Sequence, residues 1–222
     1  MAYYPIFLEL QGMEILVVGG GSVAQRKIET LIEYGGKITI ISRELTPKLK
    51  EMVDHKDIFW KGTEFREKDL EGISLVIAAT DDKELNHLIS KSARKLGLLV
   101  NAVDQPSDCS FIVPSIVKRG DLIIAISTSG KSPAYARKVR MKLEKDFGHE
   151  YEKFLMIMGR IRQEILALGF TQDENRSFFQ RVADSDIIDA IKNEDWERVE
   201  YRLKELIPKG LSVDRLLNGI GY

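Results

Sequence analysis

Cysteine is almost absent from this sequence of 222 residues, which contains Cys109 alone. A single cysteine cannot form an intrachain disulfide, and it cannot supply the thiolate cluster of a structural zinc site. The three histidines, at positions 55, 87 and 149, are scattered and lack the spacing of metal ligands. The sequence therefore predicts no resident metal site, and we expect Cys109 to be a small buried filler.

Long hydrophobic runs and a strong charge bias are also missing. No apolar stretch reaches the length of a membrane-spanning helix, and the first residues lack the basic region and apolar length of a signal peptide. The net charge of −1 creates no global attraction to nucleic acid or to a membrane. We therefore expect a cytoplasmic protein that binds neither nucleic acid nor membrane. Its composition, 44% hydrophobic and 30% charged, is that of an ordinary globular chain.

The first half of the chain alternates strand-like and helix-like segments. Short stretches rich in Val, Ile and Leu predict strands at 15–18, 37–41, 58–61, 75–79 and 98–103. Helical spacing predicts helices at 23–34, 47–53 and 83–95. Near-continuous apolar strands separated by helices indicate a mostly parallel sheet covered on both faces. We therefore expect an α/β protein with a Rossmann-like sheet.

The second half has a different pattern. Two further short strands are expected at 111–113 and 122–127. Ser132 and Pro133 are typical of a helix start, with serine as the cap and proline in the first turn, and this helix is predicted to end near Phe147. Beyond residue 149, helical spacing at 151–168, 185–193 and 195–207 is not interrupted by any strand-like segment. The sequence thus predicts a small all-helical C-terminal domain.

A glycine-rich turn follows the first predicted strand. Gly19-x-Gly21-x-x-Ala24 separates an apolar strand from a helix, which is the arrangement of a dinucleotide-binding turn. Gly19 would allow the tight turn, Gly21 would let the backbone approach a pyrophosphate, and Ala24 would keep the helix close to the sheet. The helix N-terminus would offer N–H groups to the phosphates. An ordinary tight turn is the alternative interpretation.

The end of the second predicted strand does not decide between NAD and NADP. An acidic residue at this point usually holds the adenosine ribose, whereas arginine favours a 2′-phosphate. The sequence here reads Ser42-Arg43-Glu44, which contains one residue of each kind. A charge exposed on a loop is an equally good interpretation of Arg43.

Asn101 and Asp104 follow the fifth predicted strand. Open α/β sheets bind ligands beyond the carboxyl ends of their strands, so both side chains are expected near the cofactor crevice. An aspartate placed there can accept a proton from a substrate while hydride leaves for a nicotinamide. The alternative is that Asp104 caps the turn before Pro106.

Positive charge is concentrated between residues 113 and 145. The basic residues of this segment are Lys118, Arg119, Lys131, Arg137, Lys138, Arg140, Lys142 and Lys145. The loop Ser127–Ser132 adds hydroxyl groups and a glycine before a helix N-terminus. Together they predict an anion site for a ligand with several carboxylates or phosphates. A solvated helix face is the alternative, and nucleic acid is a weaker one, because Tyr135 is the single aromatic residue of the segment.

Six separated motifs, in this order and spacing, carry a resemblance to a known family. They are Pro5–Leu8, Val17–Lys27, Ala78–Asp82, Asn101–Asp104, Ser110–Ser115 and Ile126–Arg137. The sequence resembles the siroheme synthase family, in particular the precorrin-2 dehydrogenase module that occurs alone or fused to a methyltransferase. The motifs cover residues 5 to about 145, and a helical C-terminal domain also belongs to the family.

The resemblance implies an activity and a set of ligands. The family oxidises precorrin-2 to sirohydrochlorin with NAD⁺, and many members also insert Fe²⁺ to give siroheme. The substrate is a tetrapyrrole with eight carboxylates, which would explain the basic segment. The family is generally a homodimer, with much of the interface after Pro114, so some of the basic residues would serve the partner subunit. The resemblance favours NAD over NADP.

The resemblance also implies roles for individual residues. The essential aspartate of the family falls on Asp104. The expected cofactor contacts are Gly19, Gly21, Ser22, Val23, Arg43 and Glu44. The expected substrate contacts are Asn101, Ser129, Lys131 and Arg137. The loop Thr128–Lys131 departs from the usual family pattern of Ser-Ser-Gly-Gly, which affects the detail of the anion contacts.

Three expected parts follow from these observations. Residues 1–113 would form the NAD-binding Rossmann-like domain, 114–147 the dimerisation and substrate-binding segment, and 148–222 the helical C-terminal domain. Fe²⁺ is expected as a possible substrate, since the porphyrin nitrogens rather than a protein cluster would be its final ligands. A non-catalytic NAD-sensing module is the alternative function, and such a module has no use for Asp104 beside a basic segment.

Overall fold

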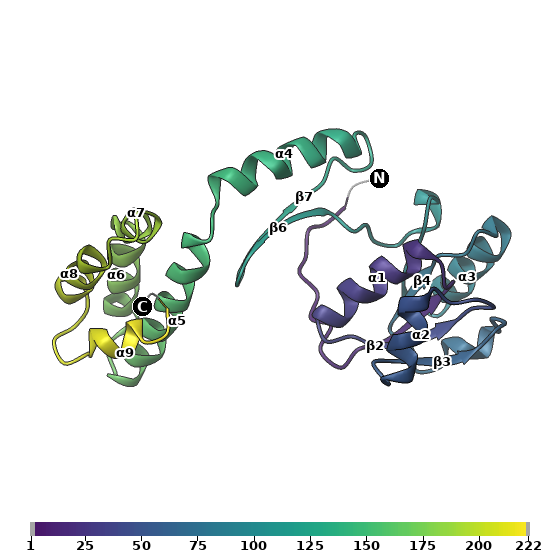
Figure 1. Cartoon of the computed structure of the whole chain (residues 1–222), viewed down its shortest axis with the longest axis horizontal. Coiled ribbons are helices and arrows are strands. Elements are labelled where there is room, and N and C mark those ends of the chain that lie inside the picture. The colour runs from purple at the N-terminus through teal and green to yellow at the C-terminus, as the bar shows by residue number, and fades with distance from the viewer. Residues whose placement is uncertain (1–2, 221–222) are drawn as a thin grey trace. The chain divides into compact units, whose positions relative to one another are not determined.

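The computed structural model describes residues 3–220. The chain divides into two compact units at Val113 and Pro114, and each is described by itself (Figure 1). The further separation of residues 114–147 from 148–222 into a substrate-binding segment and a helical domain stays a prediction.

A five-stranded, fully parallel sheet forms the centre of the first unit. Its strands are β1 (Glu14–Val18), β2 (Lys37–Ile41), β3 (Ile58–Gly62), β4 (Leu75–Ala78) and β5 (Leu99–Ala102). Their order is β3-β2-β1-β4-β5, so the chain reverses direction across the sheet between β3 and β4. This confirms the predicted Rossmann-like sheet. Because all five strands are parallel, their carboxyl ends lie at one edge, where such sheets bind ligands.

Helices cover both faces of this sheet. The helical elements of the first unit are α1 (Ser22–Glu33), α2 (Pro47–Asp54), η1 (Glu67–Leu70), α3 (Lys83–Lys95) and η2 (Pro106–Asp108). Ile15 and Val17 of β1 pack in a cluster with α1 and α2, while Leu16 and Val18 pack in a second cluster with α3. Both faces of β1 are therefore buried, which is why its sequence is continuously apolar instead of alternating.

An ion pair between buried Asp69 and half-exposed Lys61 lies at the C-terminal end of β3. Asp69 is 5% exposed, and its carboxylate lies 2.9 Å from Lys61 Nζ and accepts a hydrogen bond from the backbone N–H of Arg66 at 2.8 Å. Burial raises the pKa of Asp69, but the hydrogen bonds from Lys61 and from the Arg66 N–H outweigh burial and hold the pKa below its usual range.

Asp69→Asn is expected to destabilise the chain at neutral pH by about 0.5–1.5 kcal/mol, because the charge-assisted contact is lost while the half-exposed Lys61 ammonium can bind water instead. Since the pKa of the folded carboxyl is lowered, this contribution is present above the unfolded pKa near 3.8 and is lost as pH falls through the folded pKa. Urea unfolding at pH 7 and at pH 2.5–3 (about one unit below the unfolded value) measures the difference. A variant as stable as the parent at pH 7 would contradict it, and Glu71→Gln, an exposed neighbour, is the control.

The second unit combines a hairpin with helices. Its elements are β6 (Ser115–Arg119), β7 (Leu122–Ile126), α4 (Pro133–Asp146), α5 (Glu150–Ala167), α6 (Gln172–Ala183), α7 (Ile187–Lys192), α8 (Trp196–Leu206) and α9 (Val213–Leu217). The strands pair antiparallel through a two-residue turn at Gly120 and Asp121. At the start of α4, Ser132 Oγ accepts from the N–H of Tyr135 at 3.2 Å and Pro133 follows the cap, which confirms the predicted helix start.

Hydrophobic packing in this unit is concentrated in the helices after α4. Residues of α5, α6, α7, α8 and α9 form one buried cluster. Between residues 114 and 147, in contrast, Val117 and Ala136 are the buried hydrophobic residues. The hairpin and α4 therefore have little core of their own, and a two-stranded hairpin is marginally stable in water.

Several elements differ from the sequence-based prediction. Residues 111–113 are not a strand: Phe111 packs against the core cluster of its own unit, and the strand β6 begins only after Pro114, which has no N–H. The helices α6 and α9 lie in segments without a predicted element. A signal for α6 was present, since Thr171 and Glu174 form a reciprocal capping box at its start.

Candidate active site

A cleft of about 850 Å³ lies at the carboxyl edge of the sheet in the first unit. Its lining comes from the glycine turn after β1, the segment after β2, residues 63–65 after β3, and residues 79–82 after β4. Gly19, Gly21, Arg43 and Glu44, all predicted as cofactor contacts, line this one cleft. Ser22 and Val23 follow directly at the start of α1.

The three glycines of the turn have different reasons to be glycine. Gly19 has a φ of +119°, and a Cβ there would lie 2.2 Å from the carbonyl oxygen of Ala79. A Cβ on Gly20 would lie 2.0 Å from the carbonyl oxygen of Glu44. The dinucleotide-binding motif assigns no role to Gly20. Glycine is required there because the segment after β2 packs directly against its backbone.

Gly21 has no such constraint from the chain. Its φ of −80° is open to any residue, and a Cβ built on it meets no atom within 4 Å. The fold itself would therefore accept a side chain at position 21, yet glycine leaves the space in front of the backbone open. A backbone bare of Cβ at the mouth of a cleft is what close approach of a pyrophosphate needs.

The start of α1 supplies hydrogen-bond donors beside this space. The N–H of Gln25 bonds to the carbonyl of Gly21, and Gly21 provides no side-chain cap for the first turn. The N–H groups of Ser22 and Val23 thus lie at the uncapped, positive end of a 12-residue helix. Ala24 is fully buried, which brings this helix end close to the sheet. Donors and space together fit the phosphates of a dinucleotide.

The lining of the cleft is rich in carboxylates. Glu44 and Glu64 follow β2 and β3, Asp81 and Asp82 follow β4, and Arg43 is the single basic residue of the lining. The Arg43 guanidinium lies 3.9 Å from the carboxylate of Glu64, with both side chains largely exposed. This charge distribution suits a ribose diol, whose hydroxyls donate to carboxylates, better than a 2′-phosphate.

Asp104 lies in the loop that follows β5, at the same edge of the sheet. Its side chain is exposed and its φ is +59°, a left-handed conformation that is uncommon outside glycine. Ser129, in the second unit, also has a positive φ of +52°. Such strained backbone is found most often at functional sites, because surrounding contacts must hold it in place.

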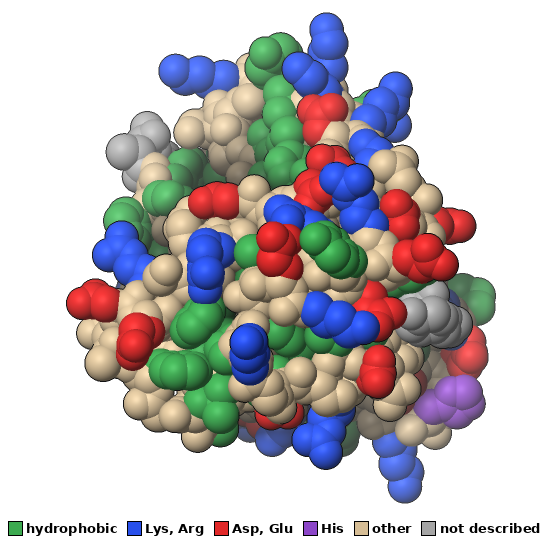
Figure 2. Space-filling model, turned by 90° about the vertical axis from the view of Figure 1, so that its left-hand side faces the viewer, with side chains coloured by type: hydrophobic (Ala, Val, Ile, Leu, Met, Phe, Trp, Pro, Cys, Tyr) green, Lys and Arg blue, Asp and Glu red, His purple; other side chains and the backbone are tan. Residues whose placement is uncertain are grey.

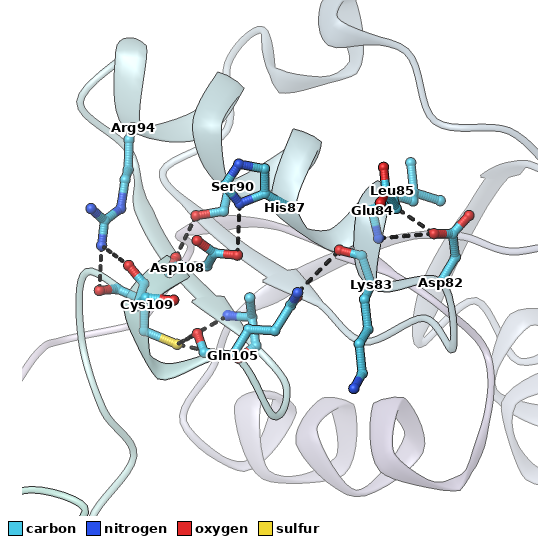
Figure 3. A network of polar contacts seen from close by, with 12 residues as sticks. Asp82, Lys83, Glu84, Leu85, His87, Ser90, Arg94, Gln105, Asp108 and Cys109 are labelled. Carbon is cyan, nitrogen blue, oxygen red and sulfur yellow. Dashed lines mark hydrogen bonds and ion pairs between the residues drawn. The ribbon is translucent and has the colours of Figure 1, made fainter.

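One face of α3 holds the Asp104 loop (Figure 3). The residues of α3 that contact the loop follow helical spacing and are Lys83, His87, Ser90 and Arg94. Gln105 Nε2 donates to the Lys83 carbonyl at 3.1 Å, and His87 Nδ1 lies 2.9 Å from the Asp108 carboxylate.

Two further residues of α3 complete this attachment. The hydroxyl of Ser90 donates to the Asp108 carbonyl, and Arg94 donates to the carbonyls of Ser107 and Cys109. The loop that carries Asp104 is therefore fixed to α3 by side chains on successive turns. This accounts for how a strained residue can keep one conformation.

Asn101 lies near the end of β5, and its side chain is buried. Its amide oxygen accepts from Lys27 Nζ at 3.1 Å, and its amide nitrogen donates to the Phe111 carbonyl at 3.1 Å. Asn101 therefore has structural contacts, and its predicted substrate role stays a prediction. Cys109 is also buried, in the cluster beneath α3, as expected for a small filler.

The basic segment lies in the second unit, and part of it is used structurally. Arg119 donates to the carbonyls of Glu144 and Phe147, and Arg140 pairs with the carboxylate of Glu144. Lys131 and Arg137 are exposed. The predicted substrate roles of Ser129, Lys131 and Arg137 stay predictions.

Neither a metal-ligand cluster nor a membrane-spanning helix is found in residues 3–220. Within this range, no three His, Cys, Asp or Glu side chains come together as a ligand set, and no helix is long and apolar enough to cross a membrane. On the face drawn in Figure 2, acidic and basic side chains are interspersed with small hydrophobic areas.

Comparison with known proteins extends this description. Residues 6–115 match a family model described as putative NAD(P)-binding, and residues 119–145 match one described as sirohaem biosynthesis protein central. Siroheme synthase 3 of Aeromonas hydrophila is 39% identical over 186 residues, which is 84% of this chain and 40% of that protein. The siroheme synthase of Photorhabdus laumondii is 37% identical over 205 residues, 92% of this chain and 44% of that protein.

The chain belongs to the siroheme synthase family. It spans less than half the length of the curated siroheme synthases given above. A solved structure, "SirC, precorrin-2 dehydrogenase", has 25% sequence identity and a TM-score of 0.75 and aligns over 90% of this chain and all of its own. For this member of the siroheme synthase family, the matched NAD(P)-binding model ends at residue 115, just after the first unit.

Proposed function

We propose that this protein oxidises precorrin-2 to sirohydrochlorin with NAD⁺ in siroheme biosynthesis. The observation that carries the proposal is the pairing of two features at one edge of the sheet, the cleft in front of Gly21 and the strained, held Asp104. The likeness to siroheme synthases and to a precorrin-2 dehydrogenase supports the substrate. The matches give the alternative, an NAD-sensing module, no support.

Asp104 would act as the general base of this oxidation. Loss of two hydrogens from the macrocycle releases one hydride and one proton. NAD⁺, when bound, accepts the hydride, and the Asp104 carboxylate accepts the proton or positions the carbon that loses it. The α3 contacts would keep the carboxylate in place, since its left-handed backbone needs outside support.

The pyrophosphate would be held by the glycine turn and the start of α1, at Gly19, Gly21, Ser22 and Val23. The adenosine ribose would be held by Arg43 and Glu44. We propose NAD rather than NADP, because Glu44 follows β2 next to Arg43 and because Glu64 lies beside this one arginine of the lining. Exposed Lys131 and Arg137, with Ser129, would bind carboxylates of the tetrapyrrole.

We extend the proposal to Fe²⁺ as a second substrate. When Fe²⁺ enters the macrocycle, two pyrrole N–H protons leave, and the Asp104 carboxylate would accept them. The metal would be held by the macrocycle nitrogens at the end of the step, so a resident metal site on the protein is not needed.

The direct test follows the absorbance of precorrin-2 with NAD⁺, NADP⁺ or neither. We expect conversion to sirohydrochlorin with NAD⁺ and formation of one NADH for each macrocycle. A folded protein that binds NAD⁺ and leaves precorrin-2 unchanged would refute the activity. Addition of Fe²⁺ to purified sirohydrochlorin then tests metal insertion separately.

We further propose that the protein is a homodimer located in the cytoplasm. The free thiol of Cys109 fits a reducing compartment. The hairpin and α4 lack a core, and Val113, Tyr135 and Met141 are each at least half exposed. A second copy that covers this segment would bury the apolar surface, which supports the dimer.

Ile123→Glu is expected to convert the dimer into a monomer. Ile123 pairs with Lys118 on the strand face opposite Val117, the hairpin residue that is buried against its own unit. In the dimer a carboxylate there would lose its hydration, a cost that the Lys118 ammonium across the hairpin offsets only in part, whereas in the monomer it would face water. Sedimentation should give twice the 25.2 kDa chain mass for the parent and the single mass for the variant.

Tyr201→Glu, on an exposed position of α8, is the matched control and should remain dimeric. A parent that sediments as a monomer at all concentrations would contradict the dimer.

A further inference from the structure

Lys27 joins the cofactor end of the first unit to the Asp104 loop. It lies on α1, six residues after Gly21, and its ammonium donates to Asn101 Oδ1 at 3.1 Å. Asn101 belongs to β5 and is three residues ahead of Asp104. One hydrogen bond therefore connects the helix whose N-terminus faces the cleft with the strand that leads into the loop.

Asn101 also contacts the end of the loop that follows Asp104. Its Nδ2 donates to the carbonyl of Phe111 at 3.1 Å and lies 3.6 Å from Cys109 Sγ. Residues before and after Asp104 are thus tied to one buried side chain. Because Lys27 occupies the amide oxygen, the amide nitrogen is left to point at the Phe111 carbonyl, so the lysine fixes which way the amide is turned.

The position of Lys27 is unusual for a residue that only decorates a surface. The side chain is partly buried, and burial lowers the pKa of its ammonium. Lysine is rarely buried unless it has a charged partner, and the hydrogen-bond partner of Lys27 is the neutral amide of Asn101. The fold therefore tolerates an unfavourable placement to keep this hydrogen bond.

We propose that Lys27 is a positioning residue, which acts through Asn101 to hold the Asp104 loop in register with the cofactor turn. The expected effect of Lys27 on turnover rests on the proposed dehydrogenase function, whereas its expected effect on the order of the loop does not. The hydrogen bonds of α3 hold the outer side of the loop, and the Lys27–Asn101 pair holds the ends that enter and leave it.

A double-mutant cycle tests whether Lys27 acts through Asn101. Lys27→Met keeps the length of the side chain and removes the donor, and Asn101→Leu removes both amide contacts. Each is expected to lower kcat by about 10- to 100-fold, because a small misplacement of a reacting group costs this much. The affinity for NAD⁺ should stay within about twofold, since neither side chain lines the cleft.

The double variant should lose no more kcat than the worse single variant, because both substitutions remove the same Lys27–Asn101 hydrogen bond. A loss equal to the product of the single losses would overturn the proposal, since Lys27 would then act elsewhere. Lys27→Arg should recover part of kcat. Should Asn101→Leu not fold, Asn101→Ser takes its place, because serine is too short to reach both partners.

Amide hydrogen exchange of the ligand-free chain gives a readout that needs no substrate. Lys27→Met should raise exchange in residues 102–111 by at least about tenfold and leave the β1–β2 region unchanged. Lys37→Met, an exposed lysine on β2, is the matched control and should change neither exchange nor kcat.

Unchanged exchange in Lys27→Met, or a lowered melting temperature with unchanged kcat, would overturn the positioning role. If the parent chain does not oxidise precorrin-2, the proposed function fails, and the exchange experiment still decides whether Lys27 holds the loop.

Discussion

Asp104→Asn is expected to lower kcat for precorrin-2 oxidation by about 10²–10⁴-fold, the range that a general base contributes. Asparagine is the sharpest replacement because it adopts positive φ at least as readily as aspartate, so the backbone at +59° can be kept. The carboxylate is lost while the shape of the loop is retained. Stopped-flow absorbance in the presence of saturating NAD⁺ measures the change.

The affinity for NAD⁺ separates a catalytic role from a structural one. We expect its Kd to change by less than about twofold in Asp104→Asn, because Asp104 does not line the cleft. Asp104→Ala should lose turnover to the same extent and also lose stability, since alanine at positive φ adds about 1 kcal/mol of strain. Retained turnover in Asp104→Asn would remove Asp104 from the chemistry.

Gly21→Ala is expected to weaken NAD⁺ binding by about 100-fold, which corresponds to about 2.8 kcal/mol. A methyl group would occupy the space from which the pyrophosphate approaches the N–H groups of Ser22 and Val23. The fold should hardly respond, because the added Cβ meets no atom within 4 Å and φ is −80°. Fluorescence titration with NAD⁺ and thermal unfolding measure the two effects.

Gly19→Ala provides the contrast within the same turn. There the added Cβ would lie 2.2 Å from the Ala79 carbonyl oxygen at a φ of +119°, so the variant should lose several kcal/mol of stability. If Gly21→Ala destabilises the chain as much as Gly19→Ala, or if it binds NAD⁺ normally, Gly21 does not serve the cofactor.

The parts of the fold that follow local rules could be predicted from the sequence. The strand before the glycine turn was expected at 15–18 and is β1 (Glu14–Val18), and the Ser132-Pro133 helix start is where the sequence places it. In both cases the signal lies within a few neighbouring residues. The predicted parallel sheet follows from the same local signals, because continuous apolar strands need cover on both faces.

Elements that depend on distant partners could not be predicted in this way. The strand β6 is defined by its pairing with β7, and apolar residues 111–113 ahead of Pro114 are more strand-like by composition. The helix α6 is mostly polar. Its capping box indicates where it starts, but Phe178 and Phe179 pack on a cluster built by α5 and by the later helices, which periodicity within the segment does not predict.

The same distinction applies to the site. Gly19, Gly21, Arg43 and Glu44 lie near each other because the carboxyl ends of parallel strands meet at one edge, which topology alone predicts. The burial of Asn101 and its bond to Lys27, 74 residues away, cannot be predicted from either local sequence. A polar residue at a strand end is expected to face a ligand, and the contacts of Asn101 within the chain become visible only once α1 is packed on the sheet.

The environment of Cys109 gives this protein a built-in reporter. The thiol is buried, and its sulfur bonds to the backbone of Ala102 and Gln105, on either side of Asp104. An alkylating reagent can reach the sulfur only when these contacts open. Because the chain has no second cysteine, the rate of thiol labelling in the unmodified protein measures how often the Asp104 loop detaches from the sheet. Substrate or cofactor that closes the loop would slow this labelling, without any engineered probe.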